Sequence, residues 1–205
     1  MEQRKQRSFH VHVSRRIVIY FPSIVRPLPS SNLLIKRKQM RLSNVKPRKQ
    51  QPSKILVAVD GSDSSINAAD YAITLVKNIK NDDNTDKEAT VFVVNVIDLP
   101  PIFKMLPSET RKQLIRIGRQ QGSQIFDAVD EMVKRNNAAK LKIIKEMVET
   151  TSASAADEII KYAKEKGVDL IVVGTKGRSR MSKALLGSVA SKVVTYSSCS
   201  VLVAR

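Results

Sequence analysis

The sequence predicts an α/β protein built on a single doubly wound parallel sheet of five strands, in the order 3-2-1-4-5, with helices on both faces. Two observations carry this prediction. From Lys54 onward, short and continuous apolar runs alternate with longer segments of helical periodicity. Such runs are typical of strands buried on both faces, and strictly alternating strands and helices form parallel sheets through right-handed crossovers.

The expected strands differ in character. The first begins with Ile55-Leu56-Val57-Ala58-Val59, is wholly apolar and ends at Asp60-Gly61, which is typical of a central strand. The third alternates polar and apolar residues, so we expect it at an edge of the sheet. The five expected strands are 55–59, 90–97, 140–149, 169–174 and 200–204.

The helices between them carry their own signals. Ser154 and Asp157 have the spacing of a capping box, and Gly167 is placed to end that helix in a left-handed conformation. Gly118 and Gly122 fall inside the longest helix, and we expect them to weaken it. The four expected helices are 62–80, 108–137, 154–166 and 188–196.

The net charge of +17 divides the 205-residue chain into two parts. Residues 1–52 hold 13 Lys and Arg against one acidic residue, a net +12, and are expected to be a poorly ordered basic extension. Two alternatives are a polycation that binds nucleic acid and a targeting peptide. Residues 53–205 form the α/β domain. A single cysteine fits a reducing cytoplasm, and no apolar run is long enough to span a membrane.

Histidine usage limits the chemistry of the domain. Both histidines, His10 and His12, lie in the basic extension. Ser-His-Asp, Cys-His and HExxH sites therefore cannot be built in residues 53–205. The sequence favours a binding protein over an enzyme.

One loop of the domain has the composition of a phosphate-binding site. It runs from Gly174-Thr175-Lys176-Gly177 to Gly187-Ser188 and contains three of the seven glycines and four basic residues, with no acid. Glycines let backbone N–H groups approach a ligand closely, and a helix N-terminus attracts anions. The order 3-2-1-4-5 places this loop opposite Asp60, at the switch point where ligands bind. The alternatives are a solvated surface loop and an Asp60 that only caps the first helix or satisfies loop amides. The basic residues are Lys176, Arg178, Arg180 and Lys183.

These motifs resemble the universal stress protein family, UspA-like and of the ATP-binding type, with its Rossmann-like fold. Gly174, Gly177, Gly187 and Ser188 match the family pattern G-x2-G-x9-G-[ST]. The first, second, fourth and last strands are also similar, so the resemblance covers residues 53–205. Ala190 stands where some ATP-binding members have a hydroxyl residue, which implies one phosphate hydrogen bond fewer.

The resemblance implies a nucleotide site and its residues. The ligand is ATP or another adenine nucleotide, with Mg²⁺ bound through the phosphates. Asp60 is implied near the ribose or the metal, the backbone of Val96 at the adenine edge, and the glycines at ribose and phosphates. The implied nucleotide-binding residues are Ala58, Asp60, Val96, Gly174, Thr175, Gly177, Gly187, Ser188 and Val189.

We therefore expect a stress-response or regulatory module that binds ATP with little or no turnover. One alternative is a slow ATP hydrolase or phosphotransferase, with Asp60 holding the metal and Lys176 or Arg178 stabilising the phosphoryl charge. Another is nucleic-acid binding through residues 1–52. The family implies a homodimer, and the last strand, Ser200 to Ala204, would otherwise leave an apolar edge unpaired.

Overall fold

The computed structural model describes residues 17–20, 52–80, 89–151, 154–177 and 186–204. Its strands form one sheet in the order β1-β6-β5-β2-β3-β4. From β6 to β4 all neighbours are parallel, which confirms the predicted order 3-2-1-4-5 with the third expected strand at one edge. The strands are β1 (Ile17–Tyr20), β2 (Lys54–Ala58), β3 (Thr90–Asp98), β4 (Lys142–Thr150), β5 (Leu170–Gly174) and β6 (Ser200–Ala204).

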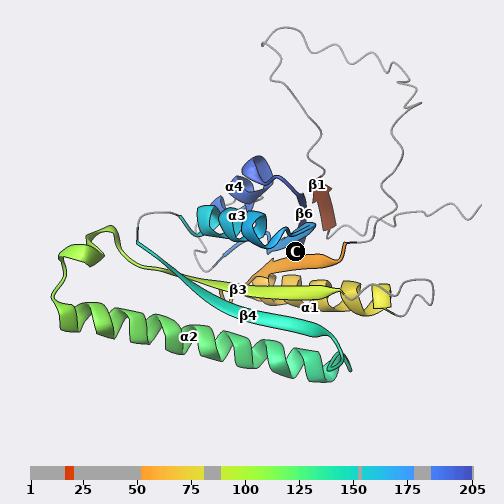
Figure 1. Cartoon of the computed structure of the whole chain (residues 1–205), viewed down its shortest axis with the longest axis horizontal. Coiled ribbons are helices and arrows are strands. Elements are labelled where there is room, and N and C mark those ends of the chain that lie inside the picture. The colour runs from red at the N-terminus through yellow and green to blue at the C-terminus, as the bar shows by residue number, and fades with distance from the viewer. Residues whose placement is uncertain (1–16, 21–51, 81–88, 152–153, 178–185, 205) are drawn as a thin grey trace, which may run out of the picture.

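Helices cover both faces of the sheet (Figure 1). On one face, α1 and α2 bury a core with the side chains of Ile55 and Val57; on the other, α3 and α4 pack against Leu56. Successive residues of a strand point to opposite faces, so an apolar strand such as β2 serves both cores. A 3₁₀ helix, η1, lies between β3 and α2. The helices are α1 (Asp63–Lys80), η1 (Pro101–Met105), α2 (Ser108–Arg135), α3 (Ala155–Lys166) and α4 (Ser188–Tyr196).

Helix α3 begins and ends as its sequence predicts. The side chain of Ser154 accepts a hydrogen bond from the Asp157 backbone N–H, and the Asp157 carboxylate accepts one from the Ser154 backbone N–H. Gly167 then ends the helix with a φ of 63°. The capping box and the left-handed glycine are both confirmed, and together they satisfy backbone groups that a helix leaves open at its ends.

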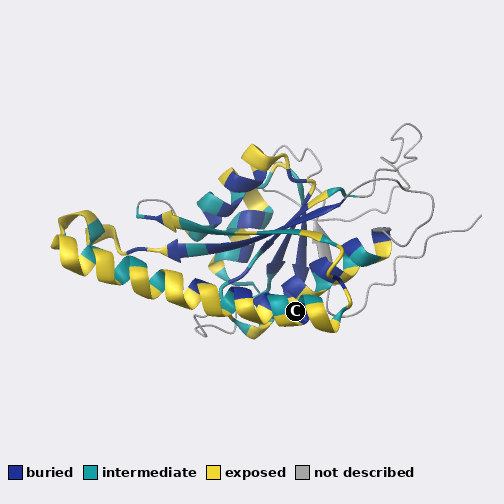
Figure 2. Ribbon diagram, turned by 60° about the horizontal axis from the view of Figure 1, so that its bottom comes forward, coloured by how far each residue is buried: buried dark blue, intermediate teal, exposed yellow. Residues whose placement is uncertain are grey.

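Helix α2 extends well beyond the rest of the molecule at its N-terminal end (Figure 2). Only its C-terminal half packs deeply, through Phe126, Val129 and Met132. Gly118 and Gly122 serve a purpose that the sequence does not reveal. A Cβ at Gly118 would overlap Ile97 Cγ2, and one at Gly122 would lie 2.8 Å from Met147 Sδ. The two glycines therefore let the helix approach β3 and β4 closely, whereas they had been expected only to weaken it.

One segment of the basic extension pairs with the sheet, which the composition of residues 1–52 did not predict. Ile17–Tyr20 forms β1, which pairs antiparallel with β6 at the outer edge of the parallel sheet (Figure 1). The rest of the extension up to residue 51 lies outside the described residues. In the described part of the chain, no helix has the length and hydropathy needed to cross a membrane.

Candidate functional site

A cavity of about 650 Å³ opens at the carboxyl ends of the central strands. Its floor is the ends of β2, β3 and β5, and its walls come from α2, α3 and the N-terminus of α4. This is the position where doubly wound sheets hold ligands. The structure brings all nine residues of the expected site to this cavity: Ala58, Asp60, Val96, Gly174, Thr175, Gly177, Gly187, Ser188 and Val189.

Asp60 and the glycine loop lie directly against each other. A Cβ built on Gly177 would stand 2.8 Å from Asp60 Oδ2, so only a glycine fits beside this carboxylate without a shift. Asp60 Oδ1 accepts hydrogen bonds from the Ser62 backbone N–H at 3.0 Å and from Ser62 Oγ at 2.6 Å. One carboxylate oxygen thus organises the turn after β2, as the alternative reading of Asp60 expected, while the other faces the glycine loop.

Serines at the start of α1 hold the glycine loop in place. The Ser64 hydroxyl donates to the Lys176 carbonyl, and Ser62 Oγ lies 3.2 Å from the same carbonyl. The end of β5 approaches this helix so closely that a Cβ on Gly174 would lie 2.7 Å from the Ser64 backbone oxygen. The first part of the loop is therefore fixed by serine hydroxyls and by the close approach of Gly174 to the backbone of Ser64.

Two further backbone bonds connect the loop to the last strand and the last helix. The Gly187 N–H donates to the Thr175 carbonyl at 2.7 Å, and the Thr175 N–H donates to the Ala204 carbonyl at 2.8 Å. Gly187 is thereby placed at the N-cap of α4, with no side-chain cap bond. The first N–H groups of a helix have no partner within it, and the helix dipole adds positive potential there. The first N–H groups of α4 thus lie at the wall of the cavity.

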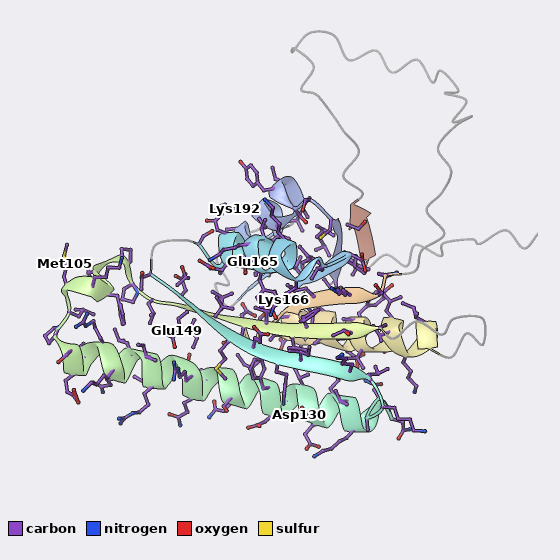
Figure 3. The ribbon with its side chains drawn as sticks, in the orientation of Figure 1. Met105, Asp130, Glu149, Glu165, Lys166 and Lys192 are labelled. Atoms are coloured by element: carbon purple, nitrogen blue, oxygen red, sulfur yellow. The ribbon has the colours of Figure 1, made fainter. Side chains whose placement is uncertain are left out.

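Lys192 fixes the start of α3 against α4. Lys192 projects from α4 (Figure 3). Its ammonium donates to Asp157 Oδ2 at 2.7 Å and to Ser154 Oγ at 3.1 Å. This ion pair and the capping bonds of Ser154 lower the pKa of Asp157 to about 2. Because both helices line the cavity, Lys192 helps to set the distance between two of its walls.

Strand β3 offers an open backbone edge to the cavity. Its last pairing with β2 is at Val94, which accepts a hydrogen bond from Val59, yet β3 continues to Asp98. Backbone groups of a strand face alternate sides, so the N–H and carbonyl of Val96 point to the same side as those of Val94. No residue of β2 stands opposite Val96 in the register, and Val96 lines the cavity.

The sequence did not single out three contributors to the site. Buried Asn95 donates to the Val59 carbonyl at 2.8 Å and so fixes the chain just before Asp60. An amide within an otherwise apolar strand was the available signal for it. The serines of α1 and the apolar wall of α2 gave no comparable signal. That wall consists of Leu114, Ile117, Gly118, Gln121 and Ile125.

The charged groups of the site are few among the described residues. Lys176 lines the cavity, whereas Arg178, Arg180 and Lys183 lie outside the described part of the chain. The carboxylates on the cavity wall are Asp60 and Asp98. The ranges that the structure describes contain no group of three or more metal-ligating side chains.

Comparisons with known proteins agree with this architecture. The model of the universal stress protein family matches residues 52–205. The chain is 35% identical over 153 residues to the universal stress protein MJ0531 of Methanocaldococcus jannaschii, covering 74% of this chain and 81% of the relative. It is 33% identical to YxiE of Bacillus subtilis, covering 75% and 99%. A universal stress protein solved in complex with cAMP has the same fold, with a TM-score of 0.54, 24% identity and coverage of 75% and 97%. The chain belongs to the universal stress protein family.

Proposed function

We propose that this protein binds ATP in the cavity and acts as a regulatory module with little or no turnover. The observation that carries the proposal is the contact between Gly177 and Asp60, with the N-terminus of α4 beside it. This arrangement puts backbone N–H donors and one carboxylate around the same space. It suits a polyphosphate chain and its metal ion better than it suits a neutral ligand.

The phosphates would lie between the glycine loop and α4. Here the N–H groups of Ser188 and Val189, at the first turn of α4, have the geometry of an anion site. Ala190 is buried and supplies no hydroxyl, so binding would depend mainly on backbone donors and on the Ser188 side chain. Backbone donors are already fixed by the fold, which reduces the entropy lost on binding.

The base would lie against the open edge of β3. The N–H and carbonyl of Val96 form one donor and one acceptor on the same side of the strand. Adenine presents an acceptor at N1 and a donor at the 6-amino group, which matches this pair. Guanine presents a donor at N1 and an acceptor at O6, which would face the wrong partners. An unsatisfied or mismatched buried polar group costs about 1–3 kcal/mol, so we expect about 10- to 100-fold preference for ATP over GTP.

The residues present fit Mg²⁺ bound through the nucleotide. Mg²⁺ in phosphate sites takes one or two carboxylates and completes its shell with phosphate oxygens and waters. Asp60 has one oxygen held by Ser62 and the other turned to the glycine loop. It would hold the ion there, and the ion would neutralise charge on the phosphates.

Slow or absent hydrolysis is part of the proposal. The domain from residue 53 onward has no histidine to act as a general base. A phosphotransferase would use Asp60 for the metal and Lys176 for phosphoryl charge, and multiple turnover abolished by Asp60→Ala would favour it. The nucleic-acid alternative depends on basic residues of the extension that lie outside the described part of the chain. We also propose a cytoplasmic location, and self-association of two copies through β6.

Calorimetric titration of the full chain tests the nucleotide proposal. We expect ATP with Mg²⁺ to bind more tightly than GTP, and EDTA to weaken ATP binding. cAMP is included because a solved family member was obtained with it; cAMP binding above ATP would change the ligand but keep the site. Equal binding of ATP and GTP would contradict the arrangement at Val96, and no binding of any nucleotide by folded protein would overturn the proposal.

A further inference from the structure

The edge strand of the parallel sheet is occupied by the chain's own extension. In β1, Val18 pairs with Val203 and Tyr20 with Val201, antiparallel to β6. β6 is already buried on both faces: Val201 and Val203 belong to the core with α3 and α4, and Leu202 to the core with α1. The part of β6 that remains available to a partner strand is therefore its outer row of backbone N–H and carbonyl groups, and β1 pairs with this row.

The register shows which backbone groups β1 occupies. The Ala204 carbonyl accepts a hydrogen bond from Thr175, so the backbone groups of Ala204 face β5. Because these groups alternate along a strand, those of Val203 and Val201 face the opposite side, toward β1. Their antiparallel partners Val18 and Tyr20 exchange both hydrogen bonds with them. The N–H groups of Ile17 and Ile19 face away from the sheet.

A second copy would need the same backbone groups. If two β6 strands paired antiparallel about a two-fold axis centred on Leu202, Val201 of one copy would bond Val203 of the other, and the reverse. Those are the positions that β1 fills. One edge cannot pair with two strands, so β1 and a second β6 exclude each other.

We infer that β1 guards the β6 edge, so that two copies associate through β6 only after β1 leaves. The inference deepens the self-association proposed above and depends on it. A four-residue strand joined to the domain through residues 21–53 is a short, weakly held partner, which makes its release feasible. Both copies must release β1, so if each β1 is docked about nine-tenths of the time, the apparent dimer affinity falls by about a hundredfold.

Full-chain variants with matched proline substitutions test whether β1 prevents association through β6. Val18→Pro with Tyr20→Pro removes the two N–H donors that face β6. Ile17→Pro with Ile19→Pro is the control. It also replaces two apolar residues of β1 by proline, but the backbone N–H groups that it removes face outward, where an edge strand tolerates proline. By sedimentation equilibrium, we expect the first variant to dimerise about a hundredfold more tightly than wild type and the control to differ less.

A disulfide that holds β1 on β6 should prevent dimerisation. Ile17→Cys with Ala204→Cys joins a directly opposed pair, within reach of a disulfide. We expect the oxidised form to stay monomeric and the reduced form to behave as wild type. If Val18→Pro with Tyr20→Pro lowers dimerisation, β1 joins copies rather than separating them, and the inference is overturned.

No gain in dimerisation would also overturn the inference, and hydrogen exchange at β6 would identify the reason. Loss of protection at Val201 and Val203 without a dimer would mean that β1 pairs as described but that copies do not meet at β6. Unchanged protection would mean that β1 does not hold this edge in solution. Nucleotide titration of the same variants is a separate readout, so failure of the nucleotide proposal would not be confused with either result.

Discussion

Replacing Gly177 by alanine is the sharpest test of how the cavity would hold a phosphate chain. The new Cβ would stand 2.8 Å from Asp60 Oδ2, whereas ordinary contact begins near 3.4 Å, so the two groups must separate by about 0.6 Å. Asp60 cannot simply yield, because its other oxygen is held by the N–H and hydroxyl of Ser62. The loop would therefore have to shift away from Asp60, which changes the position of its backbone relative to the proposed phosphates.

The expected cost falls on binding rather than on folding. Forcing an extra methyl group into a packed site costs about 1–3 kcal/mol, which corresponds to about 10- to 100-fold in the ATP dissociation constant. Gly177 is exposed, so the free protein can relax the strain more easily than the complex can. Calorimetry with ATP and Mg²⁺, together with a thermal melt of the free protein, measures both effects.

Gly167→Ala is the matched control. Gly167 has a φ of 63°, ends α3 and is not part of the cavity wall. Alanine in this conformation costs about 1–2 kcal/mol, and each kcal/mol lowers Tm by about 2–4 °C in a chain of this size. We expect Gly167→Ala to lower Tm without changing ATP affinity, and Gly177→Ala to weaken ATP binding without lowering Tm. Wild-type affinity in Gly177→Ala would refute the close approach of this loop to the ligand.

Three further predictions follow from the structure. Gly118→Ala should lower the free energy of unfolding by about 1 kcal/mol in a denaturant titration, because overlap with Ile97 outweighs the helix propensity gained. Adding Ile97→Leu, which lacks the overlapping methyl, should restore part of the lost stability. The pKa of Asp157 by NMR should be about 2 and should rise toward 3.8 in Lys192→Ala; the stabilisation it gives is complete above pH 3.8 and lost as pH falls through about 2. Asn95→Leu should lower Tm and weaken ATP binding, and unchanged binding would show that its bond to Val59 does not position the site.

The sequence predicted the parallel sheet and the ends of its helices because local signals there agree with the tertiary structure. The apolar runs that became β2, β3 and β5 are buried on both faces, so nothing in their pattern conflicts with their environment. The capping box at Ser154 and the glycine at position 167 act within one turn of helix, so no distant contact was needed to predict them. The cavity could be located for a related reason: the strand order alone brings Asp60 and Gly174 to one edge.

Features that depend on contacts between distant segments were missed. Gly118 and Gly122 look like helix-weakening residues in a sequence, and only the position of Ile97 and Met147 shows that any larger side chain would overlap them. Asn95 likewise looks like an interruption of an apolar strand until its bond to Val59 is seen. In each case the residue type is explained by a neighbour far away in the sequence.

The pairing of β1 with β6 is a feature that the composition of the extension did not predict. Thirteen basic residues in 1–52 dominate the average, and a five-residue apolar run at 17–21 is too short to change it. Such a run cannot form a strand alone, but it needs only an existing edge to pair with, and the edge of β6 is provided by the rest of the fold. The same strand carries the Ala204 carbonyl that holds Thr175 on the cavity wall. β6 therefore has two edges with two separate tasks: one supports the proposed nucleotide site, and the other is the surface for which β1 and a second copy would compete.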